Sequence, residues 1–144
     1  MGTTVVAATT THDYLHIANV GDSRAYLIQN GQMRRITDDH SMVEEGVRAG
    51  QLTEEQAAIV KGRNVLTRSV GRRDYLEVDL FEEPWRSGDV LVLCSDGLWG
   101  VLPEAQIRAV ALEYKPQEAA QKLVEMAMSA RSRDNISVIV VRYV

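Results

Sequence analysis

The sequence is poor in several residue types, and each shortage excludes a class of protein. Its 144 residues include one cysteine, three prolines and one phenylalanine. A single cysteine cannot form an intrachain disulfide or a multi-cysteine zinc site, although it suits a reducing compartment. Lysine and arginine together number 16, against 20 aspartates and glutamates. This acidic balance argues against broad, sequence-blind nucleic-acid binding.

Long apolar runs are missing as well, and we do not expect the first residues to be a secretory signal. The longest apolar stretches, VLVLC at 90–94 and VIVV at 138–141, are far shorter than the roughly 18 residues that a membrane helix needs. The first residues, MGTTVVAATTTHDY, lack the charged and apolar regions of a secretory signal. With 45% apolar and 25% charged residues, the chain is typical of one soluble globular domain over residues 1–144, and we expect it in the cytoplasm without membrane attachment.

The first part of the chain has the alternation of β-strands. Asn30-Gly31 is a strong hairpin signal, because both residues tolerate a positive φ. Strands are predicted at 3–10, 14–20, 23–29 and 32–37, arranged as one antiparallel meander, and later at 76–81, 89–94 and 136–143. The run at 90–94 is apolar throughout, so both of its faces should be buried.

Helical patterns occupy the rest of the chain. Ser41 with Glu44, and Thr53 with Gln56, have the spacing of helix capping boxes. They predict two short helices, the first ending near Gly50 and the second near Gly62, within a polar surface subdomain at 41–64. Two further helices are predicted after the prolines at 103 and 116, each with an apolar stripe.

Three aspartates lie where predicted strands end or begin. Asp22 breaks two strands, Asp96 directly follows the apolar run, and Asp134 precedes the last strand. Carboxylates gathered at one place repel each other unless a proton or a cation joins them, and oxygen ligands suit Mg²⁺ or Mn²⁺. The alternative is that each aspartate only caps a turn, and spacing alone does not distinguish the two.

Six segments, taken in order, resemble the metal-dependent protein phosphatases of the PPM type (type 2C), above all the bacterial members. No single segment is decisive, but together they extend over nearly the whole chain. They are MGTT at 1–4, ANVGDSRA at 18–25, TDDHS at 37–41, NVLTRSVG at 64–71, LVLCSDGL at 91–98 and SRDNIS at 132–137.

The resemblance implies an α+β fold, the layered α-β-β-α sandwich of that family. It also implies that the chain is the C-terminal greater part of the domain, with N-terminal strands missing and with residues 41–64 as the family's flap. Asp96 and Asp134 match ligands of the first metal. Asp22 matches a carboxylate bound to a further metal, which Asp96 would also bind. Ser95, Gly97 and Asn135 would support these ligands.

The function implied is hydrolysis of phosphoserine and phosphothreonine in proteins by a metal-activated water, with two or three Mn²⁺ or Mg²⁺ ions in the complete domain. The partners implied are phosphorylated proteins and a serine/threonine kinase. Arg72 and Arg73 are candidate phosphate contacts. The family's N-terminal Asp-Gly motif is not found, since the one Asp-Gly here is Asp96-Gly97. We therefore expect this chain alone to be inactive, and unpaired edges to favour dimerisation.

One alternative to the phosphatase interpretation remains at this point. The chain could be a non-catalytic phosphatase-like binding module, which the missing motif favours. Other reactive residues favour structural roles: Cys94 is predicted to be a core thiol, His40 a turn residue, and Trp99 a packing residue.

Overall fold

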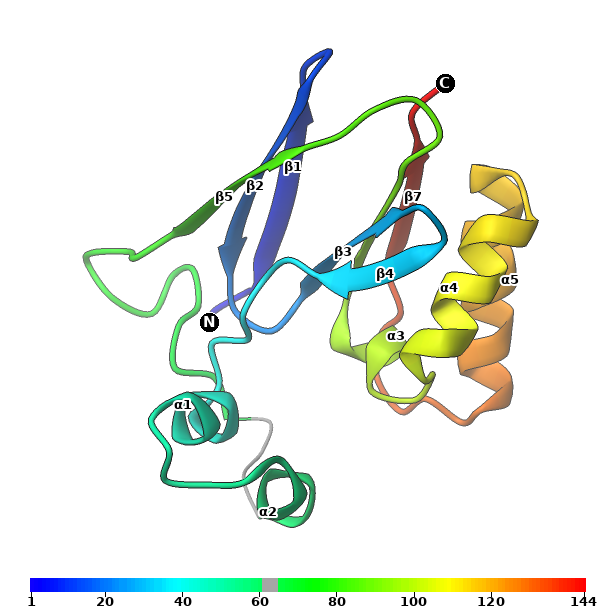
Figure 1. Cartoon of the computed structure of the whole chain (residues 1–144). Coiled ribbons are helices and arrows are strands. Elements are labelled where there is room, and N and C mark those ends of the chain that lie inside the picture. The colour runs from blue at the N-terminus through cyan, green and yellow to red at the C-terminus, as the bar shows by residue number, and fades with distance from the viewer. Residues whose placement is uncertain (61–64) are drawn as a thin grey trace.

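A computed structural model describes residues 1–60 and 65–144 and contains two antiparallel sheets (Figure 1). One sheet has the strand order β1-β2-β5, and the other has the order β4-β3-β6-β7. The strands of the first sheet are β1 (Val5–Thr10), β2 (Tyr14–Val20) and β5 (Asp79–Pro84). Those of the second are β3 (Arg24–Gln29), β4 (Gln32–Arg35), β6 (Val90–Cys94) and β7 (Val138–Arg142).

The predicted single meander is wrong, because the chain changes sheets between β2 and β3. β2 pairs with β1 and β5, whereas β3 pairs with β4 and β6. The change occurs at Gly21, whose φ of +110° is readily adopted only by glycine. Thr4 packs against Gly21 so closely that a Cβ there would overlap its side chain. The break at Gly21-Asp22 was visible in the sequence, but its consequence depends on which strands pair.

The strand predicted at 76–81 lies three residues further along the chain, at Asp79–Pro84. Pro84 is the last residue of β5. A proline is tolerated there because β5 is an edge strand, so the missing N–H leaves no ladder bond unmade.

Two apolar cores lie on the two faces of the four-stranded sheet. Every residue of β6 is buried, as predicted. Leu91 and Leu93 pack toward the three-stranded sheet, together with Leu15 and Ile17 of β2. The alternate residues of β6 pack toward the helices; they are Val90, Val92 and Cys94.

Helices α4 (Glu104–Glu113) and α5 (Pro116–Ser129) cover the outer face of the four-stranded sheet (Figure 1). Ala119, Leu123 and Ala127 form the buried stripe of α5, at the four-residue spacing of one helix face. Two sheets and one helical layer of the predicted sandwich are therefore present. Among the described residues, no helix covers the outer face of the three-stranded sheet, and Leu80 on β5 is 78% exposed.

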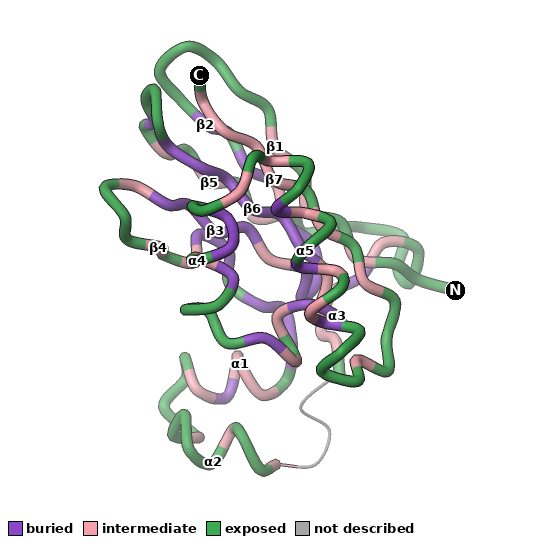
Figure 2. Tube along the Cα trace, turned by 90° about the vertical axis from the view of Figure 1, so that its right-hand side faces the viewer, coloured by how far each residue is buried: buried purple, intermediate pink, exposed green. Residues whose placement is uncertain are grey.

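The segment after β4 forms two short helices, α1 (Met42–Arg48) and α2 (Glu54–Ile59), which Figure 1 shows below the sheets. Thr53 and Gln56 form the predicted reciprocal capping box. Ser41 caps the Glu44 amide, but the Glu44 side chain bonds Arg35 at 2.8 Å rather than the cap. Figure 2 shows this segment mostly exposed. The predicted stop at Gly62 and the boundary at 64 lie outside the described residues.

Candidate metal centre

Asp22 is held in the turn where the chain leaves β2 for β3. The Gly21 N–H donates to His40 Nδ1 at 3.0 Å, and the His40 N–H donates to the Gly21 carbonyl at 2.9 Å. An Nδ1 that accepts carries no proton, so His40 Nε2 carries one and donates to Asp79 at 2.7 Å. His40 is fully buried, and its predicted structural role is confirmed by these contacts.

Asp96 begins α3 (Asp96–Trp99), a single turn that directly follows β6. The loop before β7 is joined to this turn by hydrogen bonds. Ser95 Oγ donates to the Asn135 carbonyl at 3.2 Å and accepts from the Ser137 N–H at 3.0 Å. Gly97 meets the Asn135 carbonyl so closely that no Cβ would fit. The supports expected at Ser95, Gly97 and Asn135 therefore join the two loops that carry Asp96 and Asp134.

The carboxyl of Asp96 is electrostatically coupled to both other aspartates. Burial raises the pKa of Asp96, and the neighbouring Asp134 raises it further. Burial also raises the pKa of Asp22 to about 6, with contributions from Asp96 and Asp39. A cation bound beside these acids would relieve the repulsion that raises their pKa values.

The donors at this place are carboxylate oxygens, which fit Mg²⁺ or Mn²⁺. Within residues 1–60 and 65–144, no group of three or more His, Cys, Asp or Glu side chains is close enough to hold a metal ion. Mg²⁺, however, keeps several waters and is usually bound through one or two carboxylates. The pair Asp96 and Asp134 meets that requirement, and convergence of all three aspartates on one ion stays a prediction.

A cation–aromatic pair lies beside Asp22. Arg24 binds both carboxylate oxygens of Asp39, at 2.9 and 2.7 Å, and lies 3.5 Å above the ring of Trp99. Trp99 Nε1–H donates to the Asp22 carbonyl at 2.9 Å. Trp99 was predicted to be a packing residue, and this bond was not predicted. The available signal was its position, three residues after Asp96 on a helical turn.

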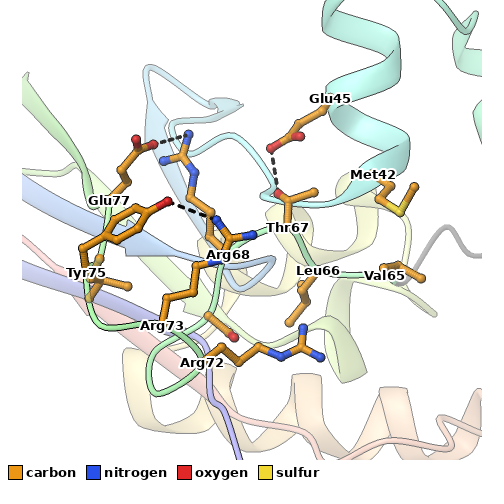
Figure 3. Close-up of a pocket in the computed structure, with 12 residues that line it drawn as sticks. Met42, Glu45, Val65, Leu66, Thr67, Arg68, Arg72, Arg73, Tyr75 and Glu77 are labelled. Carbon is orange, nitrogen blue, oxygen red and sulfur yellow. Dashed lines mark hydrogen bonds and ion pairs between the residues drawn. The ribbon is translucent and has the colours of Figure 1, made fainter.

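Arg72 and Arg73 line a pocket of about 590 Å³ together with residues of α1 and of 65–69 (Figure 3). Arg73 Nη1 donates to the Tyr75 hydroxyl at 3.3 Å, whereas Figure 3 draws no bond from Arg72. None of the described residues that line this pocket is Asp22, Asp96 or Asp134. The structure thus places the arginines together but does not bring them into one pocket with the acids.

Cys94 is buried, as predicted, and burial raises the pKa of its thiol to about 12. A thiol with that pKa stays protonated near neutrality and is a poor nucleophile. The carboxylates, and not the Cys94 thiol, are therefore the candidate functional groups of this region.

The family model described as protein phosphatase 2C matches residues 1–136. The chain belongs to the protein phosphatase 2C family.

Named relatives and solved structures support this family assignment. The chain is 42% identical to the serine/threonine phosphatase stp of Listeria innocua serovar 6a, over 98% of this chain and 56% of that protein. It matches the structure of the Streptococcus agalactiae serine/threonine phosphatase at 39% identity and a TM-score of 0.95, over 100% of this chain and 60% of that one. A structure of the PstP catalytic domain in complex with two manganese ions matches at 31% identity and a TM-score of 0.86, over 97% and 58% of the chains.

The chain spans about half the length of the curated relatives it matches, 56% in the Listeria innocua phosphatase. In the part of the chain that the structure describes, no helix has the length and apolar character to cross a membrane.

Proposed function

We propose that this chain is part of a serine/threonine protein phosphatase that hydrolyses phosphoserine and phosphothreonine in proteins. The observation that carries the proposal is the bonding of Ser95 to Asn135 and Ser137, which joins the turn of Asp96 to the loop of Asp134. Support comes from the family match over residues 1–136 and from relatives that are named serine/threonine phosphatases.

Asp96 and Asp134 would hold the first Mn²⁺ or Mg²⁺ ion, and Asp22 with Asp96 would hold a further one. When bound, such an ion lowers the pKa of a coordinated water and neutralises charge on phosphoryl oxygens. A relative in complex with two manganese ions supports this cofactor. Two or three ions are expected in the complete domain.

The residues around the carboxylates keep them in place. The Ser95 hydroxyl, held between Asn135 and Ser137, fixes the loop of Asp134 against the turn of Asp96. The Asn135 N–H donates to Asp134 Oδ1 at 2.8 Å and so orients that carboxylate. Outer-shell bonds of this kind commonly change metal affinity by about 10- to 100-fold. Arg72 and Arg73 would contact the phosphoryl group or its flanking residues.

The wider role follows from the chemistry. A serine/threonine kinase must form the phosphoesters that this enzyme would hydrolyse, so a kinase partner and a signalling role are part of the proposal. A location in the cytoplasm is also proposed. The segment at 41–64 would be a flap beside the centre. Exposed apolar side chains on the three-stranded sheet, such as Leu80 and Val5, favour dimerisation of the chain taken alone.

The test is hydrolysis of an aryl phosphate with Mn²⁺. It should be run on the chain, and on a chimaera that adds the part of the Listeria innocua phosphatase the chain does not cover. We expect turnover by the chimaera, loss of turnover in Asp96→Asn, and no activity in the chain alone. No turnover by a folded chimaera that binds Mn²⁺ would contradict the proposal.

A non-catalytic, phosphatase-like binding module is the second candidate. It is favoured by the observation that, in residues 1–60 and 65–144, no three metal-ligating side chains are gathered closely enough to hold an ion. The chimaera separates the two candidates, because a module would bind partners or metal without hydrolysing the ester.

A further inference from the structure

The indole of Trp99 joins the two segments that carry Asp22 and Asp96. Trp99 is the last residue of α3 and Asp96 is the first, so the two side chains belong to one helical turn. Trp99 Nε1–H donates to the main-chain carbonyl of Asp22 at 2.9 Å, across 77 residues of sequence. The bond therefore fixes the backbone from which the Asp22 carboxyl projects, relative to the turn that begins with Asp96.

Arg24 fixes the indole in turn. Its guanidinium carbon lies 3.5 Å from the ring centroid of Trp99, and its side chain is 13% exposed. Asp39 accepts two bonds from it, and the Tyr26 hydroxyl accepts a third at 3.0 Å. A desolvated cation over a tryptophan ring is attracted to the negative face of the ring. Trp99 is thus held from one face while its N–H points to the Asp22 turn.

The contact acts against a repulsion. Asp22 and Asp96 both carry carboxylates, and the Trp99 bond links the segments that hold them. Without a cation, two such carboxylates gain by moving apart. A hydrogen bond to the Asp22 carbonyl from the turn of Asp96 resists that movement without neutralising either charge.

We propose that Trp99, held by Arg24, is a positioning residue that sets the separation of Asp22 and Asp96 and thereby the affinity of these carboxylates for a divalent cation. This inference rests on the proposed function, because it presumes that the carboxylates bind a metal. It adds that a residue without any ligating atom tunes the binding.

The test is Mn²⁺ binding to the chain, measured by isothermal titration calorimetry. Trp99→Phe keeps an aromatic ring under Arg24 and removes the N–H together with part of the indole, a loss of size that the control below matches. We expect it to weaken Mn²⁺ binding about tenfold, the lower end of the effect of an outer-shell bond. Arg24→Lys, which keeps the charge and loses the planar stack, should weaken it in the same direction.

Trp85→Phe is the matched control. Trp85 is buried, and its Nε1–H donates to the Thr11 carbonyl at 3.0 Å, so the substitution removes the same type of bond. It lies in the core between the sheets and touches no carboxylate of the centre. We expect it to lower the melting temperature and to leave the Mn²⁺ dissociation constant within about twofold of wild type.

A double-mutant cycle separates positioning from general stability. If Trp99 acts through Asp22, Trp99→Phe should no longer weaken Mn²⁺ binding in an Asp22→Asn background. An undiminished effect in that background, wild-type affinity in Trp99→Phe, or equal weakening by Trp85→Phe would each overturn the inference. Absence of Mn²⁺ binding in wild type and Asp96→Asn alike would overturn the proposed centre and this inference with it. Binding that is lost in Asp96→Asn but unchanged in Trp99→Phe and Arg24→Lys would overturn the inference alone.

Discussion

The loops that carry the aspartates and the loop that carries the arginines differ in how firmly they are held. Asp22, Asp96 and Asp134 lie in short turns between strands or at their ends, and neighbouring turns bond each of these segments. Residues 71–78 are all exposed, and Arg73 bonds only the nearby Tyr75 among the partners found for it in the described part of the chain. Acids that must meet at one point need fixed backbones, whereas cations that meet a varied substrate do not.

The largest expected effect is on catalysis. In the chimaera, Asp96→Asn should reduce aryl-phosphate turnover by at least about a hundredfold, because it removes the carboxylate shared by both proposed ions. Asp74→Asn, in the exposed arginine loop, is the control and should stay within about twofold of wild type. Equal activities of the two variants in a steady-state assay would remove the distinction between the loops.

The next effect is on stability. Gly97→Ala should lower the free energy of unfolding by about 2–3 kcal/mol, because the added methyl overlaps the Asn135 carbonyl. Gly50→Ala is the comparison: its φ is +74° but no atom lies within 4 Å of the new Cβ, so about 1 kcal/mol is expected. Urea unfolding of both variants measures the difference. A Gly97→Ala effect no larger than that of Gly50→Ala would show that the two loops are not tightly joined.

A smaller effect is expected from Asp22 in the absence of metal. Burial raises its pKa to about 6 in the folded chain, above the ordinary carboxyl value of 3.8, so the folded state binds the proton more tightly. Stability should therefore fall as the pH rises from about 4 to above 6, and the deficit should persist at higher pH.

Asp22→Asn removes this penalty. With a chelator at pH 7.5 it should raise the free energy of unfolding by on the order of 1 kcal/mol, allowing for solvent screening. The gain should shrink toward pH 4. Asp38→Asn, at an exposed carboxylate with 52% side-chain exposure, should change little. Differential scanning calorimetry at the two pH values measures this, and a destabilised Asp22→Asn at pH 7.5 without metal would contradict the electrostatic account.

The smallest effect belongs to the arginine loop. Arg72→Ala should raise the KM of the chimaera for a phosphopeptide by about three- to tenfold with little change in kcat, as expected for loss of one exposed charge-assisted contact. Lys115→Ala, on the far helical layer, is a charge-matched control. A fall in kcat with unchanged KM would place Arg72 with the fixed carboxylates instead.

Local sequence signals predicted much of the fold and the segments of the site. The alternation in β2, the apolar run of β6 and the box at Thr53 each depend on neighbours within a few residues. The positions of Asp22, Asp96 and Asp134 at strand ends followed from the same signals. The sheet change at Gly21 and the shift of β5 did not, because strand pairing is decided by distant partners.

The same limit applies to the contacts that hold the site. The bond from Trp99 to Asp22 joins residues 77 positions apart in the sequence. Its acceptor is a main-chain carbonyl, which every residue has, so residue type does not predict it. His40 and Asp79 meet across 39 residues. Side-chain identity indicates what a residue can bond, but the fold decides what it meets.

The most direct test of the central claim is anomalous scattering at the manganese absorption edge from crystals of the chimaera grown with Mn²⁺. The account predicts a peak roughly 2.0–2.3 Å from carboxylate oxygens of both Asp96 and Asp134, and loss of that peak in Asp96→Asn. An ordered structure with no manganese beside those two residues, or with the ion held elsewhere, would contradict it.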